Sequence, residues 1–455
     1  ANILMTALAC IHGSVAFAAI GDREPIILTW NWLEVADLQL NLSLELSPVT
    51  LGGLELVTTS TLVTLIFAVG YMEKDWSIGR FFGMMGLFEA ALSALALSDS
   101  LLLSYGLLEI LTLSTYLLVG FWYAQPLVVT AARDAFLTKR VGDIILLMGV
   151  VALSSYGVGL SFPEISQWCE TTDISPLAAT LLGLSMISGP IGKCAQFPLN
   201  LWLDEAMEGP SPASIMRNSV VVTAGAYVLI KLQPIFALSP VVSDVLIVIG
   251  LVTAIGASVV AIAQIDMKRA LSYSSSAYLG LVFIAVGLGE LDIALLLLLI
   301  HAIAKILLFM SVGSVVLTTN CQDITQMGGI WSRMPATTAA YVVGASALVV
   351  LLPMGNFWVF GQWVGSFARL PEWLLFVMLA INALSALNLT RVFRLVFLGD
   401  PQPKTRRALE APWPMALPMV SLTIVTLLTP FIPQRWQIWF AETGTGSLAT
   451  TGEVL

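Results

Sequence analysis

The sequence predicts an all-α polytopic membrane protein with an inverted repeat of five-helix units and two broken transmembrane helices. Three observations indicate the class. Hydrophobic residues make up 58% of the 455-residue chain, charged residues only 11%, and the mean hydropathy is +0.90. A soluble domain has about 25% charged residues and cannot hide so much apolar surface. Helices that satisfy their own backbone hydrogen bonds are the expected way to place it in lipid.

Apolar runs long enough to cross a bilayer predict about thirteen membrane helices. Two of the runs are interrupted, one by Ala195–Pro198 and the other by Pro353–Gly355. Broken membrane helices are tolerated where the freed backbone faces protein or water, so both breaks indicate a functional site. The predicted spans lie near residues 1–20, 49–71, 81–98, 101–122, 141–160, 177–208, 213–235, 242–263, 270–288, 291–318, 337–367, 372–397 and 414–433.

The interrupted runs lie five spans apart, so the two segments cross the membrane in opposite directions. Broken helices in opposite orientation are typical of an inverted repeat whose site lies at mid-depth. We therefore expect N-terminal helices with an extramembrane hairpin in 1–80 and a first repeat in 81–235, broken at Lys193–Pro198. A second, inverted repeat follows in 242–397, broken near Pro353, and a C-terminal region occupies 398–455.

Basic residues are distributed unevenly between alternate loops, which predicts the orientation of the chain. Loops of one parity hold eleven and those of the other parity four, so the first face is the cytoplasmic one or its equivalent. On the opposite, acidic face "DLQLNLSLEL" alternates polar and apolar residues, which predicts a hairpin strand. The eleven are Lys74, Arg80, Arg133, Lys139, Arg140, Lys268, Arg269, Arg333, Lys404, Arg406 and Arg407; the four are Arg23, Lys231, Arg369 and Arg435.

Several ionisable residues fall inside predicted spans, where a charge is expensive and usually functional. A lysine beside a carboxylate holds its proton, and it releases the proton when the carboxylate moves away, so such a pair can act as a proton switch. Ion pairs that only fix helix register are the alternative reading. The set comprises Glu89, Glu109, Asp143, Lys193 and the pair His301 and Lys305, which share a helix face.

Histidines and cysteines are too few and too scattered to predict a metal or redox centre in this chain. The sequence holds Cys10, Cys169, Cys194 and Cys321 without ligand spacing, with only His12 and His301 besides. We therefore expect no cofactor and no metal in the chain itself.

Four motifs resemble the distal antiporter-like subunit of respiratory complex I, the NuoL/NdhF type, which is related to large Mrp-type antiporter subunits. They are "GKCAQFPLNLWLDEAMEGPSP", "KRVGD", "IDMKRALSYSSSAYLG" and "HAIAKILLFMSVGSV", and the resemblance extends from about residue 25 to 400. It implies an inverted five-helix repeat in which Lys193 is the central lysine of a broken helix. It also implies Glu109 as its partner, Lys305 as a second lysine and Asp143 as a secondary carboxylate.

These roles lead to two geometric expectations. Lys193 and Glu109 should approach within ion-pair distance near the break. A continuous polar line should run from Lys193 towards His301 and Lys305, parallel to the membrane, because buried polar groups are best solvated by one another.

Three departures from the family pattern concern the same region. "GPSPASIMRNSV" has Arg217 and Asn218 around the usual histidine position, "WVFGQWV" has Gln362 in place of the exit-side lysine, and Leu297 stands where a histidine is expected. Arginine cannot release its proton at working pH, so Arg217 offers a fixed positive charge. We expect it to line a channel between a cytoplasmic partner and Lys193, with snorkelling to the interface as the alternative.

The Arg217–Asn218 departure resembles NdhF variants of cyanobacterial complexes devoted to carbon dioxide uptake. The resemblance implies a proton-translocating subunit of a thylakoid ferredoxin- or NAD(P)H-plastoquinone oxidoreductase, with iron–sulfur clusters and quinone held by other subunits. It also implies soluble carbon-dioxide-uptake (Cup) partners on the cytoplasmic face, which would supply any zinc. The alternatives are an ordinary respiratory distal subunit, an Mrp-type sodium–proton antiporter subunit and a non-conducting structural module.

The two ends of the sequence raise a further expectation. Ala1 opens inside an apolar run, so a truncated N-terminus lacking one helix is expected. The family's long lateral helix and final span are expected beyond Leu455.

Overall fold

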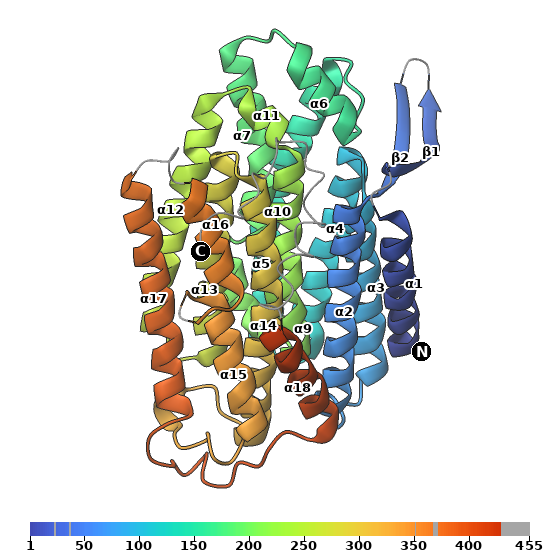
Figure 1. Ribbon diagram of the computed structural model, residues 1–455. Coiled ribbons are helices and arrows are strands. Elements are labelled where there is room, and N and C mark those ends of the chain that lie inside the picture. Colours follow the sequence, from blue (N-terminus) through green and yellow to red (C-terminus); the bar gives the residue numbers. More distant parts are fainter. Residues whose placement is uncertain (22–23, 36–37, 351, 367–371, 429–455) are drawn as a thin grey trace.

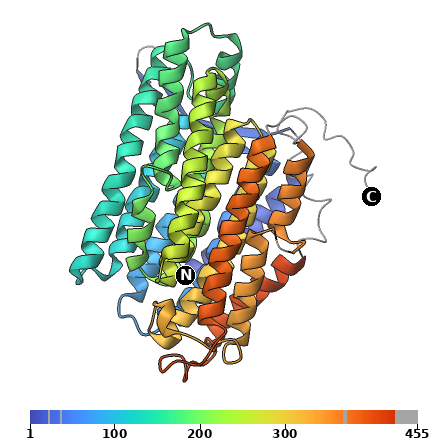
Figure 2. The same ribbon diagram turned by 90° about the vertical axis from the view of Figure 1, so that its left-hand side faces the viewer.

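The computed structural model describes residues 1–21, 24–35, 38–350, 352–366 and 372–428. Long helices run nearly parallel to one another and form an elongated bundle (Figure 1). A quarter turn shows the same alignment from the side (Figure 2). Within the described ranges, nine helices are long and apolar enough to cross a membrane. The architecture confirms the predicted all-α polytopic membrane fold.

The helices lie close to the predicted spans. In chain order they are α1 (Asn2–Ile20), α2 (Pro48–Tyr71), α3 (Ile78–Leu97), α4 (Leu101–Val119), η1 (Gly120–Trp122), α5 (Pro126–Ser155), α6 (Phe162–Thr171), α7 (Pro176–Lys193), α8 (Leu201–Glu205), η2 (Ala206–Glu208), α9 (Ser211–Met216), the π-helix η3 (Arg217–Val221), α10 (Val222–Lys231), α11 (Gln233–Ala237), α12 (Pro240–Ala263), α13 (Met267–Gly287), α14 (Leu291–Thr319), η4 (Ile324–Gln326), α15 (Pro335–Leu348), α16 (Gly355–Ser366), α17 (Glu372–Val396) and α18 (Trp413–Leu428).

Local sequence signals set several helix starts. Ser47 and Ser161 cap α2 and α6 with reciprocal side-chain and backbone hydrogen bonds, and a proline follows at the first helical position of α2 and at the second of α6. Asp266 accepts from the backbone N–H groups of Lys268 and Arg269 and so caps α13. These caps satisfy donors that would otherwise be orphaned at the membrane boundary.

Both interrupted runs are broken helices. The first stops at Lys193 and becomes helical again only at Leu201, and the second stops at Leu348 and resumes at Gly355. This finding confirms the two predicted breaks. The last predicted span begins as α18, and its residues 429–433 lie outside the described ranges, as do Arg23, Arg369 and Arg435.

The fifth helix differs from the prediction. The sequence predicts a span over 141–160, with Lys139 and Arg140 in a loop, whereas α5 is one continuous 30-residue helix that begins at Pro126. The assignment of Arg133, Lys139 and Arg140 to a loop is therefore wrong. Arg80 in α3, and Lys268 and Arg269 in α13, likewise lie in the first turns of helices. Charges lower the local hydropathy, but they do not end a helix when each side chain finds a partner in the fold.

A two-stranded antiparallel hairpin projects beyond the bundle at its end near α3 (Figure 1). Its strands are β1 (Ile26–Val35) and β2 (Leu38–Leu46), paired from Ile26 with Leu46 to Val35 with Leu38. The alternating segment noted in the sequence is β2, which confirms the predicted hairpin strand. The other strand has the sequence "IILTWNWLEV". Its first residues are mostly apolar, so they do not show the alternation of polar and apolar residues that is typical of a strand.

A close helix crossing joins α12 and α13. A Cβ atom added at Gly250 would lie 2.5 Å from the Gly280 carbonyl oxygen, and one added at Gly280 would lie 2.5 Å from the Gly250 carbonyl oxygen. Small residues that let two backbones approach this closely are the usual basis of helix packing in lipid. The two glycines thus hold α12 against the helix that carries the serine-rich site segment.

We expect Gly250→Ala to destabilise the protein by about 1–3 kcal/mol, because the new methyl group must push α12 and α13 apart. Gly256→Ala is the matched control on the same helix, since a Cβ there meets nothing within 4 Å. Alanine favours a helix over glycine by about 1 kcal/mol, so the control should be neutral or slightly stabilising. Thermal unfolding in detergent measures both, and equal melting temperatures for the two variants would contradict the crossing argument.

Candidate functional site: buried lysines on broken and packed helices

Lys193 ends the helix before the first break and is almost completely buried. Its Nζ donates to the Leu108 carbonyl oxygen at 3.1 Å and to the hydroxyl of Thr112, and it lies 2.7 Å from the Asp143 carboxylate. The exposed fraction of Lys193 is 3% and that of Asp143 is 1%. The lysine is therefore an ammonium group held inside the bundle by a full shell of acceptors.

The expected ion pair between Lys193 and Glu109 is wrong in this structure. Glu109 instead pairs with Arg140. Leu108 and Thr112 are four residues apart on α4 and so share the face that meets Lys193, whereas Glu109 lies about 100° round the helix from Leu108. The residue expected in the secondary role, Asp143, is the direct partner.

The two ion pairs share helix α5. Gly142 lets α7 approach closely, since a Cβ there would lie 2.5 Å from the Ser188 carbonyl oxygen. The next residue, Asp143, then reaches Lys193 on α7, while Arg140 reaches Glu109 on α4. One turn of α5 thus connects both carboxylates identified in the sequence.

Residues of the break form hydrogen bonds to α12 and α13. The Gln196 side-chain amide donates to the carbonyl oxygens of Cys194 and Ser276, and the Phe197 backbone N–H donates to the Thr253 hydroxyl at 3.0 Å. Trp202 donates its indole N–H to the Gly192 carbonyl oxygen at 2.7 Å. Backbone groups freed by the break therefore have partners inside the protein, as membrane depth requires.

Lys305 on α14 has a different environment from Lys193. Its Nζ donates to the Leu271 carbonyl oxygen at 2.9 Å and to the Ser274 hydroxyl, both on α13. Its exposed fraction is 0%, and no carboxylate lies within 4 Å of it among the described residues. An ammonium group that has only neutral acceptors is stabilised less than one that has a carboxylate partner.

His301 lies one turn before Lys305 and points to the π-helix η3. Its Nε2 donates to the Asn218 carbonyl oxygen at 2.9 Å, and its ring lies 5.2 Å from the Tyr278 ring. Nδ1 is buried without a hydrogen-bond partner in the described part of the chain. In the neutral ring this tautomer leaves Nδ1 as a hydrogen-bond acceptor that no described residue uses.

One helical stretch, α9–η3–α10, touches both lysine-bearing helices. At Asn218 it receives the His301 bond, and at Gly225 it packs on Lys193, where an added Cβ would lie 2.5 Å from the Lys193 Cβ. The expected polar line from Lys193 to Lys305 remains a prediction. Two observations favour a route along α13: the contact of Gln196 with Ser276, and the bond from Lys305 to Ser274.

Arg217 is completely enclosed in the protein. Its exposed fraction is 1%, and Nη2 donates to the Ala206 carbonyl oxygen and to the Ser214 hydroxyl. This burial is incompatible with the snorkelling alternative, in which the guanidinium would reach the interface. A channel lined by Arg217 remains a prediction.

Two of the other residues singled out in the sequence, Glu89 and Gln362, lie away from this region, whereas Leu297 lies one turn before His301 on α14. Glu89 accepts a hydrogen bond from Thr6 at 2.5 Å, at the contact of α3 with α1. Gln362 has an exposed side chain on α16, and Leu297 is buried in α14. The departure at Gln362 is therefore not part of the enclosed polar region.

Sequence reasoning missed four residues that the structure adds to the site: Thr112, Gln196, Ser274 and Lys139. Two signals pointed to them. "KRVGD" puts Lys139 one helical turn before Asp143, and "SYSSS" is a polar run inside an apolar span. Sets of His, Cys, Asp and Glu capable of holding a metal were not found among the described residues.

A cluster on the acidic face lies far along α10 from the π-helix. Lys231 donates to the Ser98 carbonyl oxygen at 2.8 Å and lies 3.5 Å from Glu45. In the adjoining turn between α3 and α4, burial raises the pKa of Asp99 to about 6, Lys231 opposes this rise, and the carboxylates of Glu45 and Glu164 add to it. Asp99 can therefore exchange a proton at mildly acidic pH on this face.

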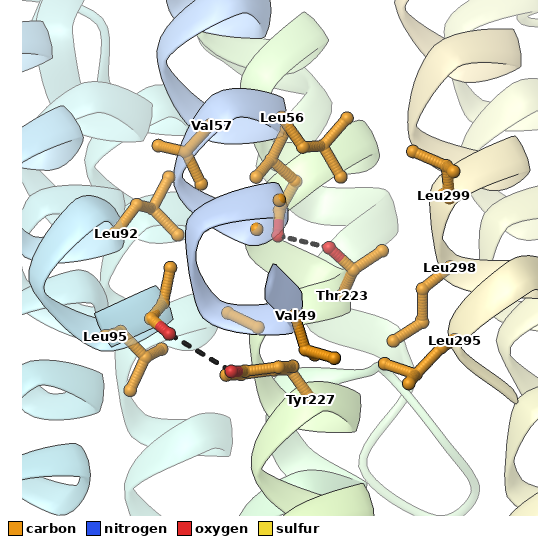
Figure 3. Close-up of a pocket in the computed structure, with 15 residues that line it drawn as sticks. Val49, Leu56, Val57, Leu92, Leu95, Thr223, Tyr227, Leu295, Leu298 and Leu299 are labelled. Atoms are coloured by element: carbon orange, nitrogen blue, oxygen red, sulfur yellow. Dashed lines mark hydrogen bonds between the residues drawn. The ribbon is translucent and has the colours of Figure 1, made fainter. Parts of the chain in front are cut away.

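An apolar cavity of about 100 Å³ lies between α2, α3, α10 and α14 (Figure 3). The two polar residues of its wall have hydrogen-bond partners in the protein. Tyr227 donates to the Ala96 carbonyl oxygen at 3.0 Å, and Thr223 donates to the Val220 carbonyl oxygen at 2.6 Å. The cavity is therefore an apolar space beside the polar region, not a section of it.

The fold and the buried lysines together define an antiporter-like membrane subunit. A family model described as NADH:quinone oxidoreductase/Mrp antiporter, TM, matches residues 98–385. A second, described as NADH-Ubiquinone oxidoreductase (complex I), chain 5 N-terminus, matches residues 32–82. The chain belongs to the family of complex I and Mrp antiporter-type membrane subunits.

Relatives of known name agree with this assignment. NAD(P)H-quinone oxidoreductase subunit 5, organellar chromatophore 2, of Paulinella chromatophora is 57% identical over 436 residues, which cover 95% of this chain and 71% of the relative. The chloroplastic subunit 5 of Mesostigma viride is 31% identical over 448 residues, 93% of this chain and 68% of the relative.

Two solved structures share the fold. A chain of the Mrp complex from Dietzia sp. DQ12-45-1b superposes with a TM-score of 0.82 at 16% identity, covering 96% of this chain and 90% of that one. A chain of the membrane-bound sulfane sulfur reductase, an archaeal respiratory membrane complex, gives 0.83 at 20% identity with the same coverage. These likenesses confirm the antiporter-like fold.

We expect Asp143→Asn to destabilise the protein by about 3–5 kcal/mol, because it leaves the Lys193 ammonium buried without a counter-charge. Replacing both partners, Asp143→Asn with Lys193→Met, should recover much of the loss. Glu109→Gln is the matched control, since its pair is partly exposed to solvent and weaker. Thermal unfolding of the detergent-solubilised protein measures all three, and a double variant as unstable as Asp143→Asn would argue against the pair.

Proposed function

We propose that this chain is a proton-translocating membrane subunit of an NAD(P)H-quinone oxidoreductase in a thylakoid-type membrane. The observation that carries the proposal is the contrast between two completely buried lysines, one paired with a carboxylate and one held by neutral acceptors. The relative from the Paulinella chromatophore and the chloroplastic relatives support the oxidoreductase and the membrane type.

The first half holds a proton in the proposed mechanism. Asp143 stabilises the Lys193 ammonium while the two groups are 2.7 Å apart. A shift of α5 that separates them removes the counter-charge, so Lys193 then releases its proton. Arg140 lies on the same turn of α5 and holds Glu109. The same shift therefore changes both ion pairs together.

The second half receives the proton. Lys305 binds only a carbonyl and a hydroxyl, so its protonated form depends on charge supplied from elsewhere. Gln196 and the serines of α13 would form the relay, and two hydrogen bonds support this: Gln196 donates to the Ser276 carbonyl oxygen, and Lys305 donates to the Ser274 hydroxyl. His301, with Nδ1 open, is a second acceptor one turn away.

Within this function we propose the variant that couples carbon dioxide hydration to proton movement. Its support is the pair Arg217 and Asn218, both buried beside the route at the position of the usual histidine. Soluble Cup-type subunits would dock on the basic face and would hold any zinc, while iron–sulfur clusters and quinone belong to other subunits. The ordinary respiratory subunit and an Mrp-type sodium–proton antiporter subunit are the alternatives.

Lys193→Ala in the intact complex is expected to abolish proton uptake coupled to quinone reduction, because the alanine has no proton to hold. Because Lys193→Ala also leaves the buried Asp143 carboxylate without its partner, the double variant Lys193→Ala with Asp143→Asn, which removes both charges, is expected to assemble and to lack proton uptake as well. Lys74→Ala, an exposed lysine on the basic face, is the control. Quenching of a pH-sensitive dye in vesicles gives the rate, and normal uptake by Lys193→Ala would refute the proton-holding role.

Deletion of the gene distinguishes the proposed variant from the alternatives. Carbon dioxide uptake, followed by membrane-inlet mass spectrometry, should fall while respiratory electron flow and sodium tolerance remain near their starting values. Purification through a tag on the chain should recover Cup-type partners. Unchanged uptake together with loss of respiratory flow would favour the ordinary subunit, and sodium sensitivity would favour the antiporter subunit.

A further inference from the structure

Three buried cations from three separate elements converge on the chain that follows the first break. They are Lys139 of α5, Arg217 of η3 and Lys268 of α13, here called the cation trio, and their exposed fractions are 1%, 1% and 4%. All three surround the segment from Trp202 to Gly209.

The contacts of the cation trio define this arrangement. Lys139 Nζ lies 4.2 Å from the centre of the Trp202 ring. Arg217 donates to the Ala206 carbonyl oxygen, and Lys268 donates to the carbonyl oxygens of Met207 at 2.6 Å and Gly209 at 3.3 Å. The charge of Arg217 acts on both lysines. The cations are therefore neighbours inside the protein and repel one another.

Carboxylates near the cation trio are committed to other groups. Among the described residues, none of the ion pairs within 4 Å includes a member of the trio. Most of the nearby carboxylates have other partners: Asp143 pairs with Lys193, Glu109 with Arg140, Asp204 and Glu208 with Arg269, and Asp266 caps the N-terminus of α13. Glu205 of the same segment is half-buried and forms no ion pair within 4 Å with the trio. Within hydrogen-bond or ring-contact distance the chain provides only carbonyl oxygens, the Ser214 hydroxyl and one aromatic face, and the carboxylates act on the trio from farther away.

Arg217 has donors left over. Its Nε and Nη1 are buried and have no hydrogen-bond partner among the described residues. Buried donors of a charged group are nearly always satisfied, and an arginine cannot escape the problem by losing its proton. The unused donors therefore indicate that a further acceptor carrying negative charge completes the site.

We propose that the cation trio binds a small monovalent inorganic anion, of the size of chloride or bicarbonate. The anion accepts from the open N–H groups of Arg217 and neutralises part of the charge of Lys139 and Lys268. Lys268 belongs to the first turn of α13, and its neighbour Arg269 is partly exposed, so the site lies about one helical turn from the basic face. Ions can thus enter from that side.

The bound anion also acts on the first buried pair. Lys139 is one helical turn before Asp143 on α5, and its charge interacts with that of Lys193. An anion at the trio offsets the repulsion between Lys139 and Lys193 and so favours the protonated, paired state of Lys193. The effect of the anion on Lys193 rests on the proposed proton function, whereas binding of the anion does not.

Equilibrium dialysis of the purified intact complex tests the site. The probes are ³⁶Cl⁻ and ¹⁴C-bicarbonate, each titrated at constant ionic strength with gluconate. Wild type and the control Lys74→Gln, an exposed cation of the same face, should bind one anion saturably per copy of the chain. Arg217→Gln should lose this binding, and Lys139→Gln and Lys268→Gln should weaken it about tenfold or more, because each removes a charge-assisted contact.

The outcomes separate the anion site from the proton function. Saturable binding that vanishes in Arg217→Gln establishes the site, whichever probe binds. Equal binding by wild type, Lys74→Gln and all three trio variants, or no saturable binding of either probe by wild type, overturns it. If the complex with Arg217→Gln does not assemble, the other two variants serve as the test. Weakened binding in Lys139→Gln and Lys268→Gln then establishes the site, and unchanged binding in both overturns it. Lys193→Ala should still bind the anion, so loss of proton uptake in that variant leaves this test unaffected.

Discussion

Burial of the Lys193 ammonium next to the Asp143 carboxylate is the interaction on which the first half of the protein depends. A charged group at this depth is tolerable only when its counter-charge and its remaining acceptors are fixed in place. The fixed partners come from three elements: α7 carries the lysine, α5 the carboxylate, and α4 the carbonyl and hydroxyl groups of Leu108 and Thr112. The relative rotation of these helices is therefore set by electrostatics as much as by apolar packing.

Close helix contact makes this pairing geometrically possible. Gly142 admits α7 to the surface of α5, and Gly225 admits the Lys193 side chain to the surface of α10. The break after Lys193 then frees backbone groups, and Gln196 and Trp202 help to satisfy them. A side-chain methyl group at either glycine position would move the helices apart and lengthen the ion pair, so packing and charge are coupled at this point.

The two halves use the same scaffold with different electrostatics. In the first half a lysine at a helix break has a carboxylate partner, and in the second half Lys305 lies in the middle of a continuous helix with neutral acceptors. Such an asymmetry stabilises the two ammonium groups to different degrees, as the proposed transfer between them requires. Between them, the π-helix exposes the Asn218 carbonyl oxygen to His301, so a local irregularity of the backbone connects both halves.

Hydropathy and helix-breaking residues by themselves determined the fold class, nearly all spans and both breaks, because lipid imposes length and apolarity on every crossing. The same reasoning found Asp143, Lys193, His301 and Lys305 as costly charges, but it assigned Glu109 to Lys193 and put Lys139 in a loop. Only the tertiary structure decided that Asp143 is the partner, that Lys139 and Arg140 lie within a continuous α5, and that Arg217 lies enclosed between two lysines. The physical reason is that sequence spacing fixes which residues share a helix face, whereas the rotation and depth of each helix against its neighbours arise from contacts between residues far apart in the chain.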